Sequence, residues 1–549
     1  MSSAPAKVGS AVTGGPVRAG RAGTRAVAAY APVVLAAATM AALGLWGLPR
    51  DSAMGNDESA TRWAALLSLP RLRHLLAHID AVHGLYYLLM HGWVALGDSP
   101  TILRIPSVIA MVAAVAMTVV LGGRLTGSAP AGLLAGLIVA LTPAISYYAQ
   151  TARSYALVFA CVVGLTLALL RAMTAETGGA AGSAGAAGSA GAAGSVGSRV
   201  ARRWLAYGAL VTLAGYLNEL ALLVLAAHAV TVLLARPPRR AVARWAAAAV
   251  AGAAAVTPVV VLSGREASAV NWIPHPTPRA LVLLLHDYFG VTAAVTVIII
   301  GCAVVAVLPP LGAGPAWWRR DGFSAQSVGL PLLVVPAGLL LLESLVARPF
   351  YVDRYVLYGE VGAALLAAAG ACRIGRWLAG PWLPAARRLA AAARRPALAW
   401  LPGVVCLCAL LLQIGPQQFV RTPASREFNF GGPARYVAAH ARQGDGVLFL
   451  GAFFRTARLG YPADFRKTSD FALAVSPQKS GTFQGIDQPF RVTRLLMLQQ
   501  RRIWVVGKSP LAPLPPGLMT DEGSVLRSRY VLMVTRGFRG VVVTLWVRR

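Results

Sequence analysis

The chain of 549 residues is 57% hydrophobic and only 13% charged, and its 51 Lys and Arg against 20 Asp and Glu give a formal net charge of +31. This composition excludes an ordinary soluble globular protein and indicates a membrane protein. The arginines lie mainly in short segments between apolar runs, which is a signal of membrane topology. We therefore expect no nucleic-acid partner despite the positive charge.

Apolar runs of roughly 17 to 25 residues, long enough to cross a bilayer as helices, recur along the chain as far as residue 415. We predict about eleven membrane spans, at 28–48, 101–122, 129–146, 153–173, 204–217, 219–235, 241–263, 291–310, 328–346, 355–372 and 398–415. The first run is interpreted as a retained helix, because residues 1–27 carry no clear cleavage site. These Gly-, Ala- and Arg-rich residues are predicted to form a disordered cytoplasmic tail.

Every other loop is richer in positive charge, as the positive-inside rule asks. This alternation puts the N-terminus in the cytoplasm, gives an odd number of crossings and puts the C-terminal region outside. One cytoplasmic segment, 174–203, contains the repeat "GAAGSA", whose small residues offer no apolar face for packing. We predict that this segment is a flexible linker.

The first external loop, 49–100, carries two adjacent carboxylates, Asp57 and Glu58, soon after the first span. One interpretation is that they begin the next helix, because acidic residues are favoured in a first turn. The other is that an acid at the membrane edge acts as a general base or as a ligand for a divalent cation. Their spacing does not decide between the two.

The same loop continues with "LLAHIDAVHGLYYLLMHGW", which is too polar at its start to cross the bilayer. We predict two helices at the outer interface, with Tyr86 among the aromatic anchors. Asp80 and His83 would share a helix face, whereas His78 and His83 approach only loosely. These side chains form a weak candidate metal site, and hydrogen bonding that fixes the loop is the alternative.

Two further polar stretches interrupt apolar runs on the outer side, "YYAQTARSYAL" with Gln150 and Arg153, and "ARPFYVDRYVLYGEVG" with Arg354. Charges at membrane depth are costly unless they are paired or face a polar cavity, so they mark a functional site. An arginine beside an apolar wall suits a lipid-linked phosphate. The alternative is that Arg354 pairs with a neighbouring acid or with lipid headgroups.

Residues 416–549 have a different character from the rest of the chain. The runs "GVLFLGA", "RIWVVGK" and "GVVVTLWVRR" are typical of strands, and "GPARYVAAHARQGD" of an amphipathic helix. We predict a small extracytoplasmic α/β domain that is large enough to bury its own core. The fold class is therefore an α-helical polytopic membrane protein with a C-terminal α/β domain.

These motifs, taken in order, resemble those of a known group of enzymes. The acidic pair, "HIDAVHGLYYLLMHGW", "LRIPSVIAMV", "YYAQTARSYAL" and "FYVDRYVLY" are similar to the motifs of GT-C glycosyltransferases of the family 39-like group, relatives of protein O-mannosyltransferases and aminoarabinose transferases. The resemblance covers residues 28–372. It implies a helical membrane core, assigned here to 28–415, with its catalytic site in the first external loop.

The resemblance also implies residue roles. Asp57 matches the family's loop acid, which deprotonates the acceptor hydroxyl or helps to hold a divalent cation, and Glu58 matches its neighbour. Arg153 and Arg354 match arginines for which contact with the donor phosphate is expected. His78, Asp80, Tyr86 and Gln150 would then support the catalytic loop.

The chain departs from the family pattern at two places. Thr151 stands where the pattern commonly has Glu, and His83 with Gly84 stands where it has Pro-Pro. A lysine that contacts the lipid phosphate in some relatives is absent from this neighbourhood, and we expect His83 to replace it. The donor sugar stays open between mannose and arabinose.

The predicted reaction moves a sugar, mannose in the first place, from a polyprenyl-phosphate donor to a hydroxyl of an envelope glycan, glycolipid or protein by a single inverting displacement. The first alternative is an arabinofuranosyltransferase that uses polyprenyl-phosphate arabinose. A lipid or glycan transporter also uses charges at membrane depth, although the chain shows no internal repeat. A non-catalytic scaffold is the third class. Substituting Asp57→Ala separates an enzyme from a scaffold.

Overall fold

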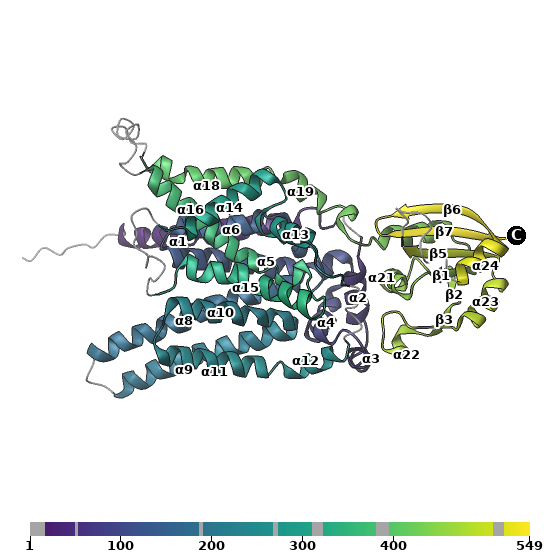
Figure 1. Ribbon diagram of the computed structural model, residues 1–549, viewed down its shortest axis with the longest axis horizontal. Coiled ribbons are helices and arrows are strands. Elements are labelled where there is room, and N and C mark those ends of the chain that lie inside the picture. Colours follow the sequence, from purple (N-terminus) through teal and green to yellow (C-terminus); the bar gives the residue numbers. More distant parts are fainter. Residues whose placement is uncertain are drawn as a thin grey trace, which may run out of the picture.

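The computed structural model describes residues 17–49, 53–185, 190–266, 273–309, 322–379, 395–508 and 521–549. A long helical body makes up most of the molecule, and a smaller α/β domain stands at one end of it (Figure 1). The short helices α2 (Asn56–Ala65), α3 (Leu69–Leu76) and α4 (Gly84–Trp93) lie where the two parts meet. The predicted first external loop therefore joins the body to the domain.

The helical body contains α1 (Val17–Leu45), α5 (Pro100–Thr126), α6 (Ala129–Leu141), α7 (Pro143–Ala149), α8 (Tyr155–Gly185), α9 (Ala190–Leu217), α10 (Val224–Ala235), α11 (Arg239–Ala254), α12 (Thr257–Gly264), α13 (Pro278–Phe289), α14 (Ala293–Val307), α15 (Ala325–Val346), α16 (Gly359–Leu378) and α18 (Arg395–Leu411). Helices extend into both segments for which the sequence predicts disorder. α1 begins at Val17, inside the predicted tail, and α8 and α9 continue to Gly185 and from Ala190 through the predicted linker. Alanine has the highest helix propensity, which the linker prediction neglected. Residues 1–16 and 186–189 lie outside the described residues.

Four helices of the described chain, α5, α8, α15 and α16, are long and apolar enough to cross a membrane, and there are up to seven spans if each of three bent pairs is counted as one. The pairs α6–α7, α11–α12 and α13–α14 bend by 66°, 44° and 76°. Pro143 and Pro258 follow the first two bends and cannot donate the backbone hydrogen bond that would continue the preceding helix. These lengths fit a multi-pass membrane protein and do not establish the predicted number of eleven spans.

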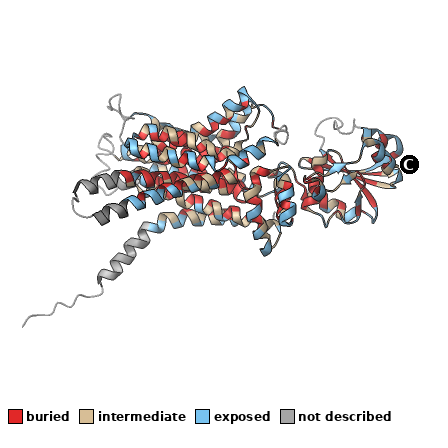
Figure 2. Cartoon of the chain, turned by 90° about the horizontal axis from the view of Figure 1, so that it is seen from below, coloured by how far each residue is buried: buried red, intermediate tan, exposed pale blue. Residues whose placement is uncertain are grey.

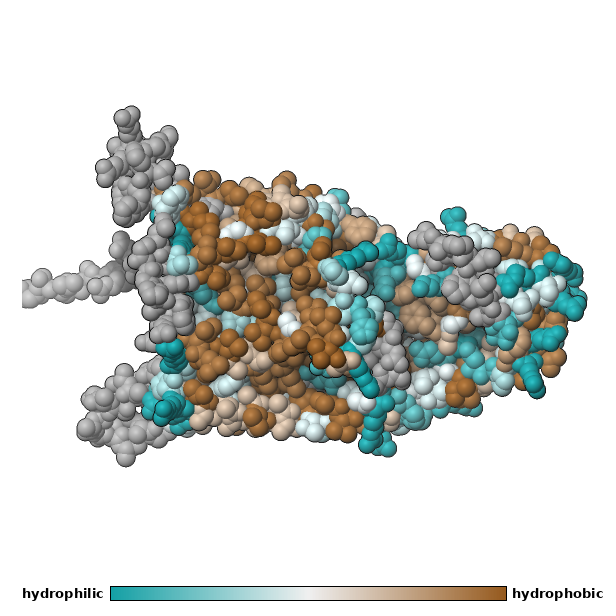
Figure 3. All heavy atoms as spheres, viewed as in Figure 1, coloured by the Kyte–Doolittle hydropathy of each residue, from teal (hydrophilic) through white to brown (hydrophobic). Residues whose placement is uncertain are grey.

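The surface of the helical body is apolar between two polar ends (Figure 3). Leu233, Val297 and Val346 are among the large apolar side chains that are exposed on it. Buried residues fill the centre of the body (Figure 2). An exposed apolar surface of this extent is suited to contact with lipid.

The α/β domain contains a five-stranded sheet in the order β2-β1-β5-β7-β6. Its strands are β1 (Asp445–Phe449), β2 (Thr468–Asp470), β5 (Arg502–Lys508), β6 (Tyr530–Phe538) and β7 (Val541–Arg548). β1 is parallel to β2 and β5, whereas β7 is antiparallel to β5 and β6. The predicted strands correspond to β1, β5 and β7 and the predicted helix to α20 (Gly431–His440), which confirms the α/β prediction.

The domain is held against α2 by close contacts. The hydroxyl of Tyr461 accepts a hydrogen bond from the backbone N–H of Met54 at 2.6 Å. Gly460, at the end of α21 (Thr456–Gly460), lies so close to α2 that an added Cβ would stand 2.3 Å from Oγ of Ser59. Only glycine permits this approach. The contacts fix the domain beside the residues that follow Gly55.

Candidate functional site

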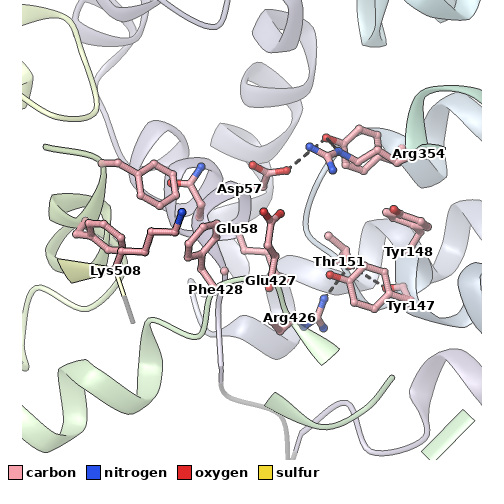
Figure 4. Close-up of a pocket in the computed structure, with 15 residues that line it drawn as sticks. Asp57, Glu58, Tyr147, Tyr148, Thr151, Arg354, Arg426, Glu427, Phe428 and Lys508 are labelled. Atoms are coloured by element: carbon pink, nitrogen blue, oxygen red, sulfur yellow. Dashed lines mark hydrogen bonds between the residues drawn. The ribbon is translucent and has the colours of Figure 1, made fainter. Parts of the chain in front are cut away.

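A cavity of about 580 Å³ lies between the helical body and the α/β domain, and we call it the junction cavity. Its walls are formed by Gly55, Asn56, Asp57, Glu58, Tyr147, Tyr148, Thr151, Tyr155 and Arg354 from the helical body and by Arg426, Glu427, Phe428, Phe453, Phe454 and Lys508 from the segment that begins the domain and from the domain itself. Figure 4 shows Asp57 and Arg354 on one side and Phe428 and Lys508 on another. The cavity thus combines both charge signs with aromatic rings.

Asp57 lies in the first turn of α2, where a carboxylate is favoured, and it also faces the junction cavity. The hydroxyl of Tyr155 donates a hydrogen bond to Oδ2 of Asp57 at 3.3 Å, and Nε of Arg354 donates to that hydroxyl at 3.0 Å. Burial raises the pKa of the Asp57 carboxyl, but the positive charges of Arg153 and Arg354 outweigh it and hold the pKa below its usual range. Asp57 is therefore ionised at neutral pH.

Glu58 is buried and fully engaged. Its two oxygens accept hydrogen bonds from Nε and Nη2 of Arg104 at 2.7 and 2.9 Å, and Oε1 also accepts one from the N–H of Ala152 at 3.0 Å. Burial raises the pKa of Glu58, but the charges of Arg104 and Arg426 lower it to about 2. This arrangement favours a positioning role, in which Glu58 ties α2 to α5, over direct contact with a substrate.

Arg153 is buried in a network next to Asp57. Its Nη2 donates to Oδ2 of Asp80 at 3.0 Å and its Nη1 to the hydroxyl of Tyr87 at 2.6 Å. Tyr87 in turn donates to the Asp80 carboxylate. Burial raises the pKa of Asp80, but the charge of Arg153 and the hydrogen bonds from Tyr87 and Arg153 bring it below the usual range. Arg153 does not line the junction cavity, so it acts on Asp57 through its charge.

His83 lies on a second cavity, of about 680 Å³, which we call the apolar cavity. Most of its walls are apolar side chains from α15, such as Leu339 and Val346, and from the segment that begins with Asn218. Nδ1 of His83 lies 3.3 Å from Oγ of Ser154. Burial, followed by the charge of Arg153, lowers the pKa of His83 to about 4. His83 therefore offers a hydrogen bond at neutral pH but no positive charge.

Arg354 stands between the two cavities. Its guanidinium carbon lies 5.7 Å from the ring centre of Tyr155, which lines the junction cavity, and 5.6 Å from that of Tyr355, which lines the apolar cavity. The two rings are themselves 6.4 Å apart. One cation thus lies beside the walls of both cavities, a few ångströms from Asp57.

The other predicted supporting residues lie outside both cavities. Nε2 of Gln150 donates to the carbonyls of Gly44 and Trp46 at 2.9 and 2.8 Å, which fixes the chain after α1. Tyr86 is fully buried. His78 is exposed at the end of α3, with Nδ1 2.8 Å from the carbonyl oxygen of His74. The structure therefore does not bring His78 to the site.

Several residues of this region were not predicted from the sequence. Arg104 could have been found, because an arginine inside an apolar helix needs a partner. Arg426 is buried and donates to Oγ1 of Thr151 and to the carbonyl of Gln150, both at 2.9 Å. Arg426 and Lys508 lie far along the chain from Asp57, and no spacing in the sequence indicates their proximity.

Within the described ranges, no group of three His, Cys, Asp or Glu side chains is arranged to hold a metal ion. Glu58 is occupied by Arg104, which leaves Asp57 as a single carboxylate for a cation at this end of α2. The described residues therefore do not form a ready metal centre of the usual three or more ligands.

No family model and no curated protein sequence matches the chain. Its structure is similar to that of ArnT, an aminoarabinose transferase, from Cupriavidus metallidurans, with a TM-score of 0.55 for the apo crystal structure and 0.54 for the structure bound to undecaprenyl phosphate. Both alignments have 13% sequence identity and cover 93% of this chain and 97% of the ArnT chain. The chain therefore has the same fold as ArnT, and at this identity the similarity establishes the fold alone.

Proposed function

We propose that this chain is an integral membrane glycosyltransferase that moves a sugar from a polyprenyl-phosphate donor to a hydroxyl of a cell-envelope acceptor. The main observation that supports this proposal is the position of Asp57. Its ionised carboxylate faces the junction cavity, and a single tyrosine hydroxyl separates it from Arg354, whose guanidinium carbon lies 5.6 Å from the ring centre of Tyr355 in the wall of the apolar cavity. This arrangement supports a reaction in which Asp57 is the base and Arg354 is the cation that binds the phosphate.

The proposed reaction is one displacement. The acceptor oxygen forms a bond to the anomeric carbon, and the bond from that carbon to the phosphate oxygen breaks. The electron pair leaves with the polyprenyl phosphate, whose negative charge Arg354 stabilises, and the acceptor proton passes to Asp57. This step inverts the anomeric configuration, because retention would need a second nucleophile and the adjacent Glu58 is engaged by Arg104.

The two cavities suit the two substrates. The apolar cavity would take the first isoprene units of the donor, with His83 as a hydrogen-bond donor near its phosphate. ArnT has been crystallised with undecaprenyl phosphate, which supports a lipid of this kind. The acceptor would enter the junction cavity, where Phe428 and Lys508 give the α/β domain a part in binding it. We place this domain outside the cytoplasm and the N-terminus inside it.

The test is transfer of radiolabelled sugar into membranes that lack the protein, supplemented with wild type or Asp57→Ala. Polyprenyl-phosphate mannose is the first donor and polyprenyl-phosphate arabinose the second. We expect Asp57→Ala to reduce transfer by about 10²- to 10⁴-fold, and Asp521→Asn, a change of an exposed acid in the α/β domain, to have no effect. Activity retained in Asp57→Ala, or a product of retained configuration, would contradict the proposal. If neither donor gives transfer, other lipid-linked sugars are tested next, and failure of those as well would favour a transporter.

The sequence resemblance leaves open whether a divalent cation near Asp57 takes part, and we propose that transfer does not depend on one. Since no group of three His, Cys, Asp or Glu side chains among the described residues is arranged to hold a metal ion, we expect EDTA to change transfer by no more than about twofold. Transfer measured with EDTA, and again after Mg²⁺ or Mn²⁺ is restored, checks this. A loss that only the metal reverses would show that a cation takes part.

A further inference from the structure

A third cavity, of about 770 Å³, lies between the C-terminal ends of α5 and α10 and the middle of α8 and α9, on the side of the helical body away from the α/β domain, and we call it the distal cavity. Four arginines from four different helices or helix ends line it: Arg124, Arg171, Arg203 and Arg236. All four are exposed, so a ligand can reach them. The positive-inside rule requires positive charge on this side of a membrane, but it does not require that the side chains converge on one cavity.

Among the described residues that line the distal cavity, no Asp or Glu balances the charge of these arginines. The only acid of α8, Glu176, is engaged elsewhere: it accepts hydrogen bonds from Nη1 of Arg244 at 2.6 Å and from Nε1 of Trp204 at 3.0 Å. The cavity is therefore complementary to an anion.

Backbone contacts fix the walls of the distal cavity. Nη1 of Arg203 donates to the carbonyl oxygen of Arg171 at 3.0 Å. The N–H of Gly322 donates to the carbonyl of Ala235 at 3.2 Å, which joins the segment before α15 to the end of α10. Arg236 ends α10 with a φ of 49°, a left-handed conformation that usually belongs to glycine at this position. At this position the backbone conformation is less strained for glycine than for the arginine that occupies it.

We infer that the distal cavity binds the phosphate headgroup of an anionic phospholipid. The guanidinium groups supply forks for phosphate oxygens. Leu170, Met173 and Phe323 add an apolar wall at the edge of the membrane-spanning region, where acyl chains would lie. A free phosphate ion would make no use of that wall, and basic cavities between membrane helices are suited to anionic lipids.

The test compares lipid binding to the full chain purified in detergent. Native mass spectrometry would measure the bound lipid in mixed micelles that contain equal amounts of phosphatidylglycerol and phosphatidylcholine. We expect wild type to prefer phosphatidylglycerol, and Arg124→Gln/Arg171→Gln to reduce this preference by about tenfold or more. The matched control is Arg202→Gln/Arg239→Gln, which removes the same charge from exposed arginines that do not line the cavity, and it should stay within about twofold of wild type.

Two outcomes would overturn the inference. The first is equal loss of the preference in both double variants, which would show a general effect of charge. The second is displacement of phosphatidylglycerol by millimolar inorganic phosphate at constant ionic strength, which would show a site for the free ion. If Arg124→Gln/Arg171→Gln does not fold, Arg236→Gln provides the same test from the end of α10. Its failure to lower the preference would likewise refute the lipid site.

Discussion

The two ends of the helical body hold their charges in different ways. At the junction with the α/β domain, Glu58 is paired with Arg104 and Asp80 with Arg153, and all four side chains are largely removed from water. At the distal end, four arginines surround one cavity, without an acid among the described residues that line it. At the junction, positive and negative side chains are paired and buried. At the distal end, the arginines are exposed to solvent and all carry the same charge.

The two arrangements of charge suit different functions at the two ends of the helical body. Paired, buried charges hold their neighbours in one geometry, which a reaction requires. Beside these pairs, Asp57 lines the junction cavity and accepts a hydrogen bond from the hydroxyl of Tyr155. Open arginines of one sign give attraction without precise geometry, which suits a mobile lipid headgroup. The following predictions test whether the two ends differ in this way.

The largest effect is expected for Arg354→Gln, which tests the proposed role of the charges at the junction with the α/β domain. The change removes the cation between the two cavities, so the departing phosphate loses its stabilising charge. We expect sugar transfer at saturating donor to fall by about 10²- to 10³-fold. Arg348→Gln, in the same loop but exposed and lining neither cavity itself, is the control and should have little effect. Equal losses in the two variants would contradict the assignment.

The next effect concerns stability. Glu58→Gln leaves Arg104 buried without its carboxylate, which should cost about 3 to 5 kcal/mol of the free energy of unfolding. The control is Asp98→Asn, because Asp98 is 43% exposed and pairs with Arg62 in the same loop. Its loss should stay below about 1 kcal/mol. Thermal unfolding of the purified variants checks this. Equal losses of stability in the two variants would show that the buried Glu58–Arg104 pair contributes no more to stability than the exposed pair.

The stability difference between wild type and Glu58→Gln should also depend on pH. The pKa of Glu58 is about 2 in the folded chain against an ordinary value of 4.5. The ionised form therefore stabilises the fold at pH values above 4.5, and this contribution is lost as the pH falls from 4.5 towards 2. We expect the gap in melting temperature between wild type and Glu58→Gln to be constant above pH 5.5 and to narrow below 4.5. A gap that widened in acid would contradict the assigned ionisation.

The smallest effects are expected for the histidines. His83→Ala removes a side chain that lines the apolar cavity and lies at hydrogen-bond distance from Ser154, and we expect transfer to fall by about tenfold. His78→Ala changes an exposed ring outside both cavities and should leave transfer within about twofold. Comparison of the two transfer rates tests whether only residues that line a cavity belong to the functional site. A larger loss in His78→Ala would extend it to α3.

The sequence determined the class of the protein because membrane insertion and strand pairing leave local patterns. Apolar runs mark helices for lipid, and the strands of the α/β domain alternate or cluster apolar residues over a few positions. The sequence also indicated Asp57, Arg153 and Arg354, since charges at membrane depth are rare and costly. In the segment 174–203, low complexity was interpreted as flexibility, whereas its alanines also favour helix, and α8 and α9 extend into it.

Only the tertiary structure decided how two adjacent acids differ: both line the junction cavity, but Glu58 is paired with Arg104, whereas Asp57 accepts a hydrogen bond from Tyr155. Asp57 and Glu58 are equivalent as a sequence pattern, but they project from α2 in different directions, and Arg104 lies within reach of Glu58. The same holds for Lys508, which reaches the junction cavity because the α/β domain packs against α2. A local pattern specifies the type of a residue and its segment. The partner of a charge depends on contacts between segments far apart in the chain, which no spacing in the sequence records.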